Sequence, residues 1–293
     1  MPGQSDRVAE FIFWGMRQIN YEQSEGVPGE THFVSLGTNR IHYVTAGRGK
    51  RTIVFIHGWA CHLGVWREQI SALADKARLI LIDLPGHGKS DKPKTAYSMD
   101  FFGEAVLAVV REAAVDQAIF IGHSLGVAVI CRVCGQAPEK VAAVVSVDGH
   151  LRQPYGTAEQ VAELLTPFGS PQYLDHARNI ILTFFPNPGT EALRDRVMAE
   201  MLATPQHVMQ SALRALFEPN HVDWNLKKVN VPVLVINVPS FRWTKGLKRY
   251  VEDRSPRSEF VVMPDAGHFP MLEKPAEFNA TLSAMLGRAG LGP

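Results

Sequence analysis

The stretch that decides the fold reads Ala118-Ile119-Phe120-Ile121-Gly122-His123-Ser124-Leu125-Gly126. Four apolar residues lead into a G-x-S-x-G pentapeptide, and a helical pattern begins directly after it. The sequence therefore predicts a strand, a sharp turn and a helix, with Ser124 at the apex of the turn. The two glycines allow the helix to approach its strand closely, and the strained turn lifts the serine hydroxyl out of the sheet. Ser124 is a candidate nucleophile, provided that a base lies beside it.

The chain has 293 residues, which is enough for one large α/β domain or for a core with an insertion. Thirty basic and 29 acidic residues give a net charge of +1, so the composition favours neither nucleic acid nor an anionic membrane as a partner. No apolar run reaches the length of a transmembrane helix, and the N-terminus lacks the pattern of a secretory signal. We therefore expect a cytoplasmic protein without an integral membrane segment. We also expect a monomer or a homodimer.

Three cysteines, Cys61, Cys131 and Cys134, cannot form a disulfide framework. Cys131 and Cys134 form a C-x-x-C, a spacing that elsewhere serves redox chemistry or metal binding. Here the pair falls inside the helix predicted after Ser124, and no second cysteine pair completes a metal site. We expect buried small side chains in a reducing compartment, and the sequence predicts neither a metal nor a cofactor.

Alternating strand and helix patterns predict a mainly parallel sheet. Residues 33–36 and 41–44 should form a β-hairpin. Further apolar segments lack polar alternation and are separated by helical patterns such as 101–113 and 127–135, which is typical of strands buried on both faces by helices. These strands are expected at 52–56, 79–82, 118–121, 141–147, 231–236 and 260–263.

One long segment interrupts this alternation. Between residues 150 and 228 the sequence shows helical stretches but no convincing strand, and such an insertion should form a helical cap over the carboxyl edge of the sheet. The predicted organisation is a core of residues 31–149 and 229–293, a cap at 150–228 and an N-terminal helical extension at 1–30, with an amphipathic helix at 8–21. The cap helices are expected at 158–165, 171–184, 191–202 and 205–217.

A nucleophilic serine needs a general base. The sequence Gly267-His268-Phe269 follows the last predicted strand and precedes a C-terminal helix. His268 should therefore lie on a loop at the same edge of the sheet as Ser124, and it is the expected base.

Two backbone N–H groups are the expected oxyanion donors. Leu125 follows the nucleophile at the N-terminus of its helix, where N–H groups point outward. Trp59 lies in the loop after the strand at 52–56 and should supply the second N–H. His57, in the same loop, is expected to support it, and the indole of Trp59 is expected to wall the acyl pocket.

Together these motifs resemble the α/β-hydrolase fold family, in its capped esterase, lactonase and haloperoxidase-like branch. The resemblance covers roughly residues 31 to 288 and implies a mainly parallel eight-stranded sheet flanked by helices, with a helical cap inserted after strand 6. It also implies that residues 83–90 form a structural turn. Similar haloalkane dehalogenases and epoxide hydrolases carry an aspartate nucleophile, and Ser124 argues against both activities. The motifs are His57-Gly58-Trp59 with Trp66, Asp83-Leu84-Pro85-Gly86-His87-Gly88-Lys89-Ser90, the Ser124 pentapeptide, Gly267-His268, and Glu273-Lys274-Pro275 with Phe278.

The acid of a catalytic triad is missing from its usual place. The family usually supplies it two to four residues after the strand expected at 231–236, but no carboxylate follows before Glu252 and Asp253. Asp148 is the expected substitute, because it ends the strand next to the nucleophile strand and some family members, certain dehalogenases among them, place their acid there. Asp265, three residues before His268, and the absence of any acid remain open as alternatives.

These residues predict a cofactor-free serine hydrolase that cleaves a small-molecule carboxylic ester or lactone through an acyl-enzyme. One alternative is a haloperoxidase-like perhydrolase or an acyltransferase that uses the same acyl-enzyme. Another is a small-molecule receptor with slow or absent turnover. Aromatic residues of the cap favour an apolar acyl or alcohol group, although they can equally form the core of the cap: Phe168, Tyr173, Phe184, Phe185 and Phe217.

Overall fold

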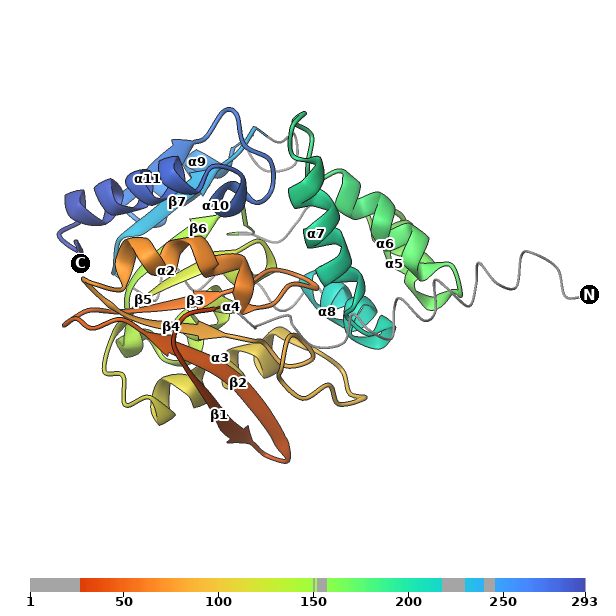
Figure 1. Ribbon diagram of the computed structural model, residues 1–293, viewed down its shortest axis with the longest axis horizontal. Helices are drawn as coiled ribbons and strands as arrows, with labels where there is room; N and C mark the ends of the chain where they lie inside the picture. Colours follow the sequence, from red (N-terminus) through yellow and green to blue (C-terminus); the bar gives the residue numbers. More distant parts are fainter. Residues whose placement is uncertain (1–26, 150, 152–156, 218–229, 240–245, 293) are drawn as a thin grey trace, which may run out of the picture.

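The computed structural model describes residues 27–149, 151, 157–217, 230–239 and 246–292. They form an eight-stranded sheet in the order β1-β2-β4-β3-β5-β6-β7-β8 (Figure 1). β2 runs antiparallel to both β1 and β4, and the other neighbours are parallel, so the predicted mainly parallel sheet is confirmed. The strands are β1 (Glu30–Leu36), β2 (Asn39–Ala46), β3 (Thr52–Ile56), β4 (Arg78–Ile82), β5 (Ala118–His123), β6 (Val141–Val147), β7 (Val233–Asn237) and β8 (Ser258–Val262).

Helices cover both faces of the sheet because successive residues of a strand point to opposite sides. On β5, a side chain at Gly122 would meet α4, whereas His123 contacts Trp66 and Phe269 on the other face. The central strands are therefore apolar on both sides and completely buried, as the lack of polar alternation predicted. The helices of the core are η1 (Leu63–Trp66), α2 (Arg67–Leu73), α3 (Met99–Glu112), α4 (Leu125–Gln136), η2 (Pro138–Lys140), α9 (Leu247–Glu252), α10 (Pro270–Glu273) and α11 (Pro275–Arg288).

A helical insertion separates β6 from β7, as predicted. Its four α-helices gather at one side of the sheet (Figure 1). Two of them have the predicted bounds, and the other two differ from prediction by one or two residues at their ends. The boundaries expected at 150 and 228 and the helix expected at 8–21 lie outside the described residues. The elements of the insertion are α5 (Ala158–Leu165), η3 (Thr166–Gly169), α6 (Tyr173–Leu182), α7 (Glu191–Leu202) and α8 (Gln206–Phe217).

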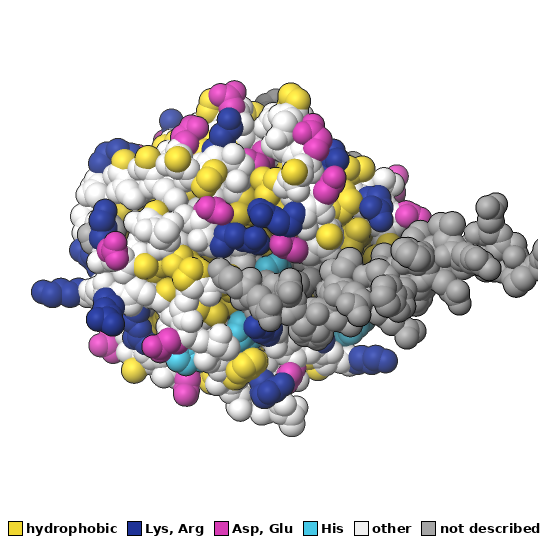
Figure 2. Space-filling view, in the orientation of Figure 1, with side chains coloured by type: hydrophobic (Ala, Val, Ile, Leu, Met, Phe, Trp, Pro, Cys, Tyr) yellow, Lys and Arg dark blue, Asp and Glu magenta, His cyan; other side chains and the backbone are white. Residues whose placement is uncertain are grey.

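Positive and negative side chains are interspersed on the face of the molecule shown in Figure 2. In the described part of the chain, no helix is long and apolar enough to cross a membrane. Those residues also contain no group of three or more His, Cys, Asp or Glu side chains placed to hold a metal ion. Cys131 and Cys134 are buried free thiols in α4, and burial raises the pKa of Cys134 to about 12.

Gly126 tests how closely α4 must approach the sheet. A Cβ there would lie 2.4 Å from the carbonyl oxygen of Ile56 and 2.6 Å from that of His57. These backbone atoms cannot move aside without disturbing β3, so Gly126→Ala should lower the free energy of unfolding by about 1–3 kcal/mol. Urea denaturation measures the change. Gly287→Ala in α11 is the control, because a Cβ there would meet nothing within 4 Å. This variant should raise the free energy of unfolding by about 0.5–1 kcal/mol. Equal stabilities of the two variants would contradict a close approach.

Candidate active site

Ser124 occupies a strained turn between β5 and α4. Its backbone has φ 53° and ψ −117°, in a region that non-glycine residues rarely adopt. The Ser124 N–H donates a hydrogen bond to the carbonyl oxygen of Val147 at 3.1 Å, so the turn is attached to the end of β6. The half-buried side chain therefore stands at the carboxyl edge of the sheet, as the sequence predicted.

The structure brings His268 and Asp148 together. His268 Nδ1 lies 2.6 Å from Asp148 Oδ2, and the two side chains are 11% and 2% exposed. Because a carboxylate only accepts, Nδ1 is the donor, which leaves Nε2 of a neutral imidazole free to accept a proton. Asp148 also has a positive φ, 38°, and its N–H donates to the carbonyl oxygen of Ile236 at 2.9 Å. Its second oxygen, Oδ1, is buried and has no hydrogen-bond partner among the residues that the structure describes.

The other carboxylates that the sequence raised lie elsewhere. Asp265, Glu252 and Asp253 are all exposed. The backbone of Asp265 accepts a hydrogen bond from Asn187 Nδ2 at 3.3 Å, which joins its loop to the segment before α7. Asn237 ends β7, near where the family's acid usually lies, and it is completely buried. Within the described part of the chain, neither of its side-chain polar atoms has a hydrogen-bond partner.

Two side chains hold the loop that carries His268. Nε2 of His123, the residue before Ser124, donates to the carbonyl oxygen of His268 at 2.7 Å, so the two loops abut. Glu273 accepts from the N–H groups of Gly267 and Phe269 at 2.8 and 3.1 Å. Burial lowers the pKa of His123 well below its ordinary value, so the imidazole is neutral and carries its single proton on Nε2, the donor in this hydrogen bond. The sequence analysis named Glu273 only as part of a family motif and did not predict these hydrogen bonds to the His268 loop.

Phe184 adds an apolar contact. Its carbonyl oxygen accepts from the His268 N–H at 2.9 Å, and its ring lies 4.5 Å from the imidazole. Two other aromatic residues of the insertion, Phe168 and Phe185, are buried in packing. Of the aromatic residues of the insertion that the sequence analysis named, Phe184 is the one whose described ring contacts include His268.

One expected oxyanion donor is next to Ser124 in the chain, and the other is in a loop that packs against it. Leu125 is the first residue of α4, and Trp59 follows Gly58 in the loop after β3. A Cβ on Gly58 would lie 3.1 Å from Ser124 Cβ, so this loop packs directly against the nucleophile turn. Within the described residues, the N–H groups of Leu125 and Trp59 donate to no other protein group.

The indole of Trp59, which the sequence predicts to wall the acyl pocket, packs against the helical insertion. Its ring is 5% exposed and packs edge-on against Phe168, with centroids 5.5 Å apart. Nε1 donates to the carbonyl oxygen of Met209 in α8 at 2.8 Å. The side chain therefore joins the core to the helical insertion.

His57 and Asp83 hold the adjoining loops, in line with the structural role expected of both. His57 Nδ1 donates to the carbonyl oxygen of Gly58 at 2.8 Å, and Nε2 accepts from the Leu84 N–H at 3.0 Å. Burial lowers the pKa of His57 to about 4, so it is neutral near pH 7. Burial raises the pKa of Asp83, but its contact with His42 at 2.7 Å and nearby histidines outweigh this and leave the pKa at about 2.

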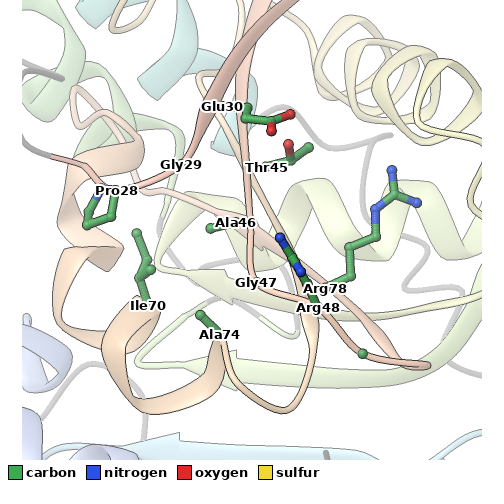
Figure 3. Close-up of a pocket in the computed structure, with 11 residues that line it drawn as sticks. Pro28, Gly29, Glu30, Thr45, Ala46, Gly47, Arg48, Ile70, Ala74 and Arg78 are labelled. Carbon is green, nitrogen blue, oxygen red and sulfur yellow. The ribbon is translucent and has the colours of Figure 1, made fainter.

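The cavity drawn in Figure 3 is separate from this constellation. It encloses roughly 650 Å³ and is lined by residues at the ends of β2 and α2 and at the start of β4, including Thr45, Ala74 and Arg78. Those strand ends lie opposite the carboxyl edge that carries Ser124. None of the predicted site residues lines it.

Comparison with known proteins agrees with this architecture. A family model described as alpha/beta hydrolase fold matches residues 51–275. The chain belongs to the α/β-hydrolase fold family. Among solved structures, Est816, described as an N-acyl homoserine lactone degrading enzyme, is 26% identical with a TM-score of 0.73, over 86% of this chain and 99% of that one.

Two curated relatives have similar levels of identity. The pimeloyl-[acyl-carrier protein] methyl ester esterase of Nitrosomonas europaea is 28% identical over 84% of this α/β-hydrolase and 99% of the relative. The dihydrolipoyllysine-residue acetyltransferase component of the acetoin cleaving system of Pseudomonas putida is 27% identical over 82% of this chain. That match spans only 64% of the relative's length.

The neutral state of His57 predicts acid sensitivity. Between the ordinary imidazole pKa of 6.5 and the folded value of about 4, the unfolded chain binds the extra proton and the folded protein does not. The free energy of unfolding should therefore fall as pH decreases through this window, by about 1.4 kcal/mol per pH unit for this histidine. Urea unfolding at a series of pH values measures the slope. In His57→Gln, this slope should be smaller by the contribution of about one proton, which is about 1.4 kcal/mol per pH unit. Above pH 7 the free energy of unfolding of the variant and of the wild type should depend on pH in the same way. Identical slopes throughout would rule out a neutral buried His57.

Proposed function

We propose that this α/β-hydrolase is a serine hydrolase that cleaves a carboxylic ester or a lactone through an acyl-enzyme. The observation that carries the proposal is the buried contact between His268 Nδ1 and Asp148 Oδ2 at 2.6 Å. Asp148 would hold the imidazole in the tautomer that leaves Nε2 able to take the proton of Ser124. Without such a base, a serine hydroxyl is a weak nucleophile at neutral pH.

In the proposed mechanism, Ser124 Oγ attacks the substrate carbonyl carbon while His268 Nε2 takes the hydroxyl proton. The N–H groups of Leu125 and Trp59 stabilise the resulting oxyanion, and the helix dipole of α4 adds to that stabilisation. Collapse of the intermediate breaks the ester C–O bond, and His268 gives its proton to the leaving alkoxide. Water, deprotonated by His268, then attacks the acyl-enzyme and releases the carboxylic acid and Ser124. A lactone would leave as one hydroxy acid.

The relatives support this substrate class. One is named as a methyl ester esterase, and Est816 is described as degrading an N-acyl homoserine lactone. In this chain the Phe184 ring lies 4.5 Å from His268 and offers apolar surface beside the proposed base. We therefore infer a substrate with an apolar acyl or alcohol group.

Removing the nucleophile tests the mechanism. Ser124→Ala should lower kcat on p-nitrophenyl acetate by on the order of 10⁴-fold or more, because no group would remain to form the acyl-enzyme. Circular dichroism should show an unchanged fold, and a fluorophosphonate probe should label the wild type but not the variant. Turnover by Ser124→Ala near the wild-type rate would exclude the mechanism. Failure of the wild type to react with the probe would favour a receptor.

Asp148→Asn tests the assignment of the acid. An amide can hold the imidazole in the wrong tautomer, so kcat should fall by on the order of 10³-fold or more while the protein stays folded. Asp265→Asn is the matched control, because that side chain is exposed and stands apart from the contact with His268. It should keep kcat within about twofold of the wild type. A larger loss in Asp265→Asn than in Asp148→Asn would overturn the assignment.

A further inference from the structure

Three residues of the loop after β3 contact the helical insertion. We call residues 57–62, which carry the proposed donor Trp59, the oxyanion loop. The indole N–H of Trp59 bonds to the carbonyl oxygen of Met209, and Thr204 Oγ1 donates to the carbonyl oxygen of Ala60 at 3.1 Å. His62 Nε2 lies 3.2 Å from Glu200 Oε2. In Figure 1 this loop reaches from β3 toward α7 and α8.

Ala60 is the strained residue of the oxyanion loop. Its φ is 55°, which a side chain disfavours, and the turn around it is closed by the Cys61 N–H, which donates to the carbonyl oxygen of Gly58 at 3.2 Å. Strained backbone persists only where its surroundings hold it. The Thr204 hydroxyl is the contact from the insertion to the Ala60 carbonyl. The Ala60 carbonyl shares a peptide group with the Cys61 N–H, which bonds to the Gly58 carbonyl, and the Gly58 carbonyl shares a peptide group with the Trp59 N–H.

The attachment is largely buried and partly charged. Thr204 is 8% exposed and His62 is 2% exposed. Glu200 is also 3.3 Å from Arg67, at the start of α2. Burial raises the pKa of Glu200, but His62 and Arg67 outweigh it and leave that pKa below its ordinary value. The Glu200 side chain is 18% exposed, and a carboxylate that is partly shielded from solvent interacts more strongly with a cation than one at the open surface.

We propose that Thr204 is a positioning residue for the oxyanion hole: by holding the Ala60 carbonyl, it fixes the direction of the Trp59 N–H. The helical insertion would then do more than cover the site, since a displacement of α7 and α8 would also move an oxyanion donor. Substrate contacts with the insertion would thereby be coupled to catalysis. This inference rests on the proposed function, because it assumes that an oxyanion forms beside Ser124.

A different contact between core and insertion supplies the control. The Tyr97 N–H donates to Ser211 Oγ in α8 at 2.8 Å, away from the oxyanion loop. Ser211→Ala therefore removes a hydrogen bond that attaches α8, the helix that follows Thr204, to the core. It leaves the hydrogen bond to the Ala60 carbonyl in place. Comparing it with Thr204 variants separates positioning of the loop from general attachment of the insertion.

Thr204→Val keeps the shape of the side chain and removes the hydroxyl, whereas Thr204→Ser keeps the hydroxyl. With p-nitrophenyl acetate, we expect Thr204→Val to lower kcat by about 10- to 100-fold with little change in KM, because loss of an oxyanion donor mainly affects the transition state. The affinity for phenylboronic acid, which forms a tetrahedral adduct with an active serine, should fall in parallel. Thr204→Ser and Ser211→Ala should both stay within about threefold of the wild-type kcat.

Wild-type kcat in Thr204→Val, or an equal loss in Ser211→Ala, would overturn the proposal, as would a change confined to KM. If Thr204→Val does not fold, Trp59→Phe removes the indole hydrogen bond to Met209 and should give the same selective loss of kcat; an unchanged kcat there would count against the proposal. Failure of the proposed function is distinguishable, since it would appear as full turnover by Ser124→Ala.

Discussion

The register between β5 and β6 is the constraint on which the site depends. His123 pairs with Val147, so Ser124 and Asp148 are the next residues on neighbouring parallel strands. Both leave the sheet with a positive φ, and each N–H donates to the adjacent strand, Ser124 to Val147 and Asp148 to Ile236. A shift by one residue would turn these side chains to opposite faces, because the side-chain period of a strand is two. Regular pairing of apolar strands thus fixes where two strained polar residues emerge.

The position of Asp148 shows how the sheet can supply a carboxylate from more than one strand. An acid that orients a histidine needs only to reach Nδ1, and parallel strands end along one common edge. Asp148 reaches His268 from β6, while β7 ends in the buried amide of Asn237. Hydrogen bonds with His123 and Glu273 hold the His268 loop in this arrangement. Its position is therefore set by groups on two other elements.

The helical insertion and the core meet at the oxyanion loop. Trp59, Ala60 and His62 each contact α7, α8 or the turn between them. A loop at the end of a strand has few backbone partners of its own, so its conformation depends on what packs against it. Here the element that covers the carboxyl edge also supplies those partners.

The sequence by itself determined the sheet, the turn at Ser124 and the order of the helices. Apolar runs and glycine spacing act over a few neighbouring residues, so strands and helices were predicted to within about two residues at most ends. The sequence also suggested Asp148 and left Asp265 open. Only the tertiary structure decided which of them contacts His268, because Asp148 is 120 residues away from the histidine along the chain and Asp265, three residues away, faces solvent. The inward packing of the Trp59 indole and the contact from Thr204 to Ala60 escaped prediction for the same reason. Local pattern fixes the backbone of each element, whereas contacts between loops depend on strand register and on the helices packed above them.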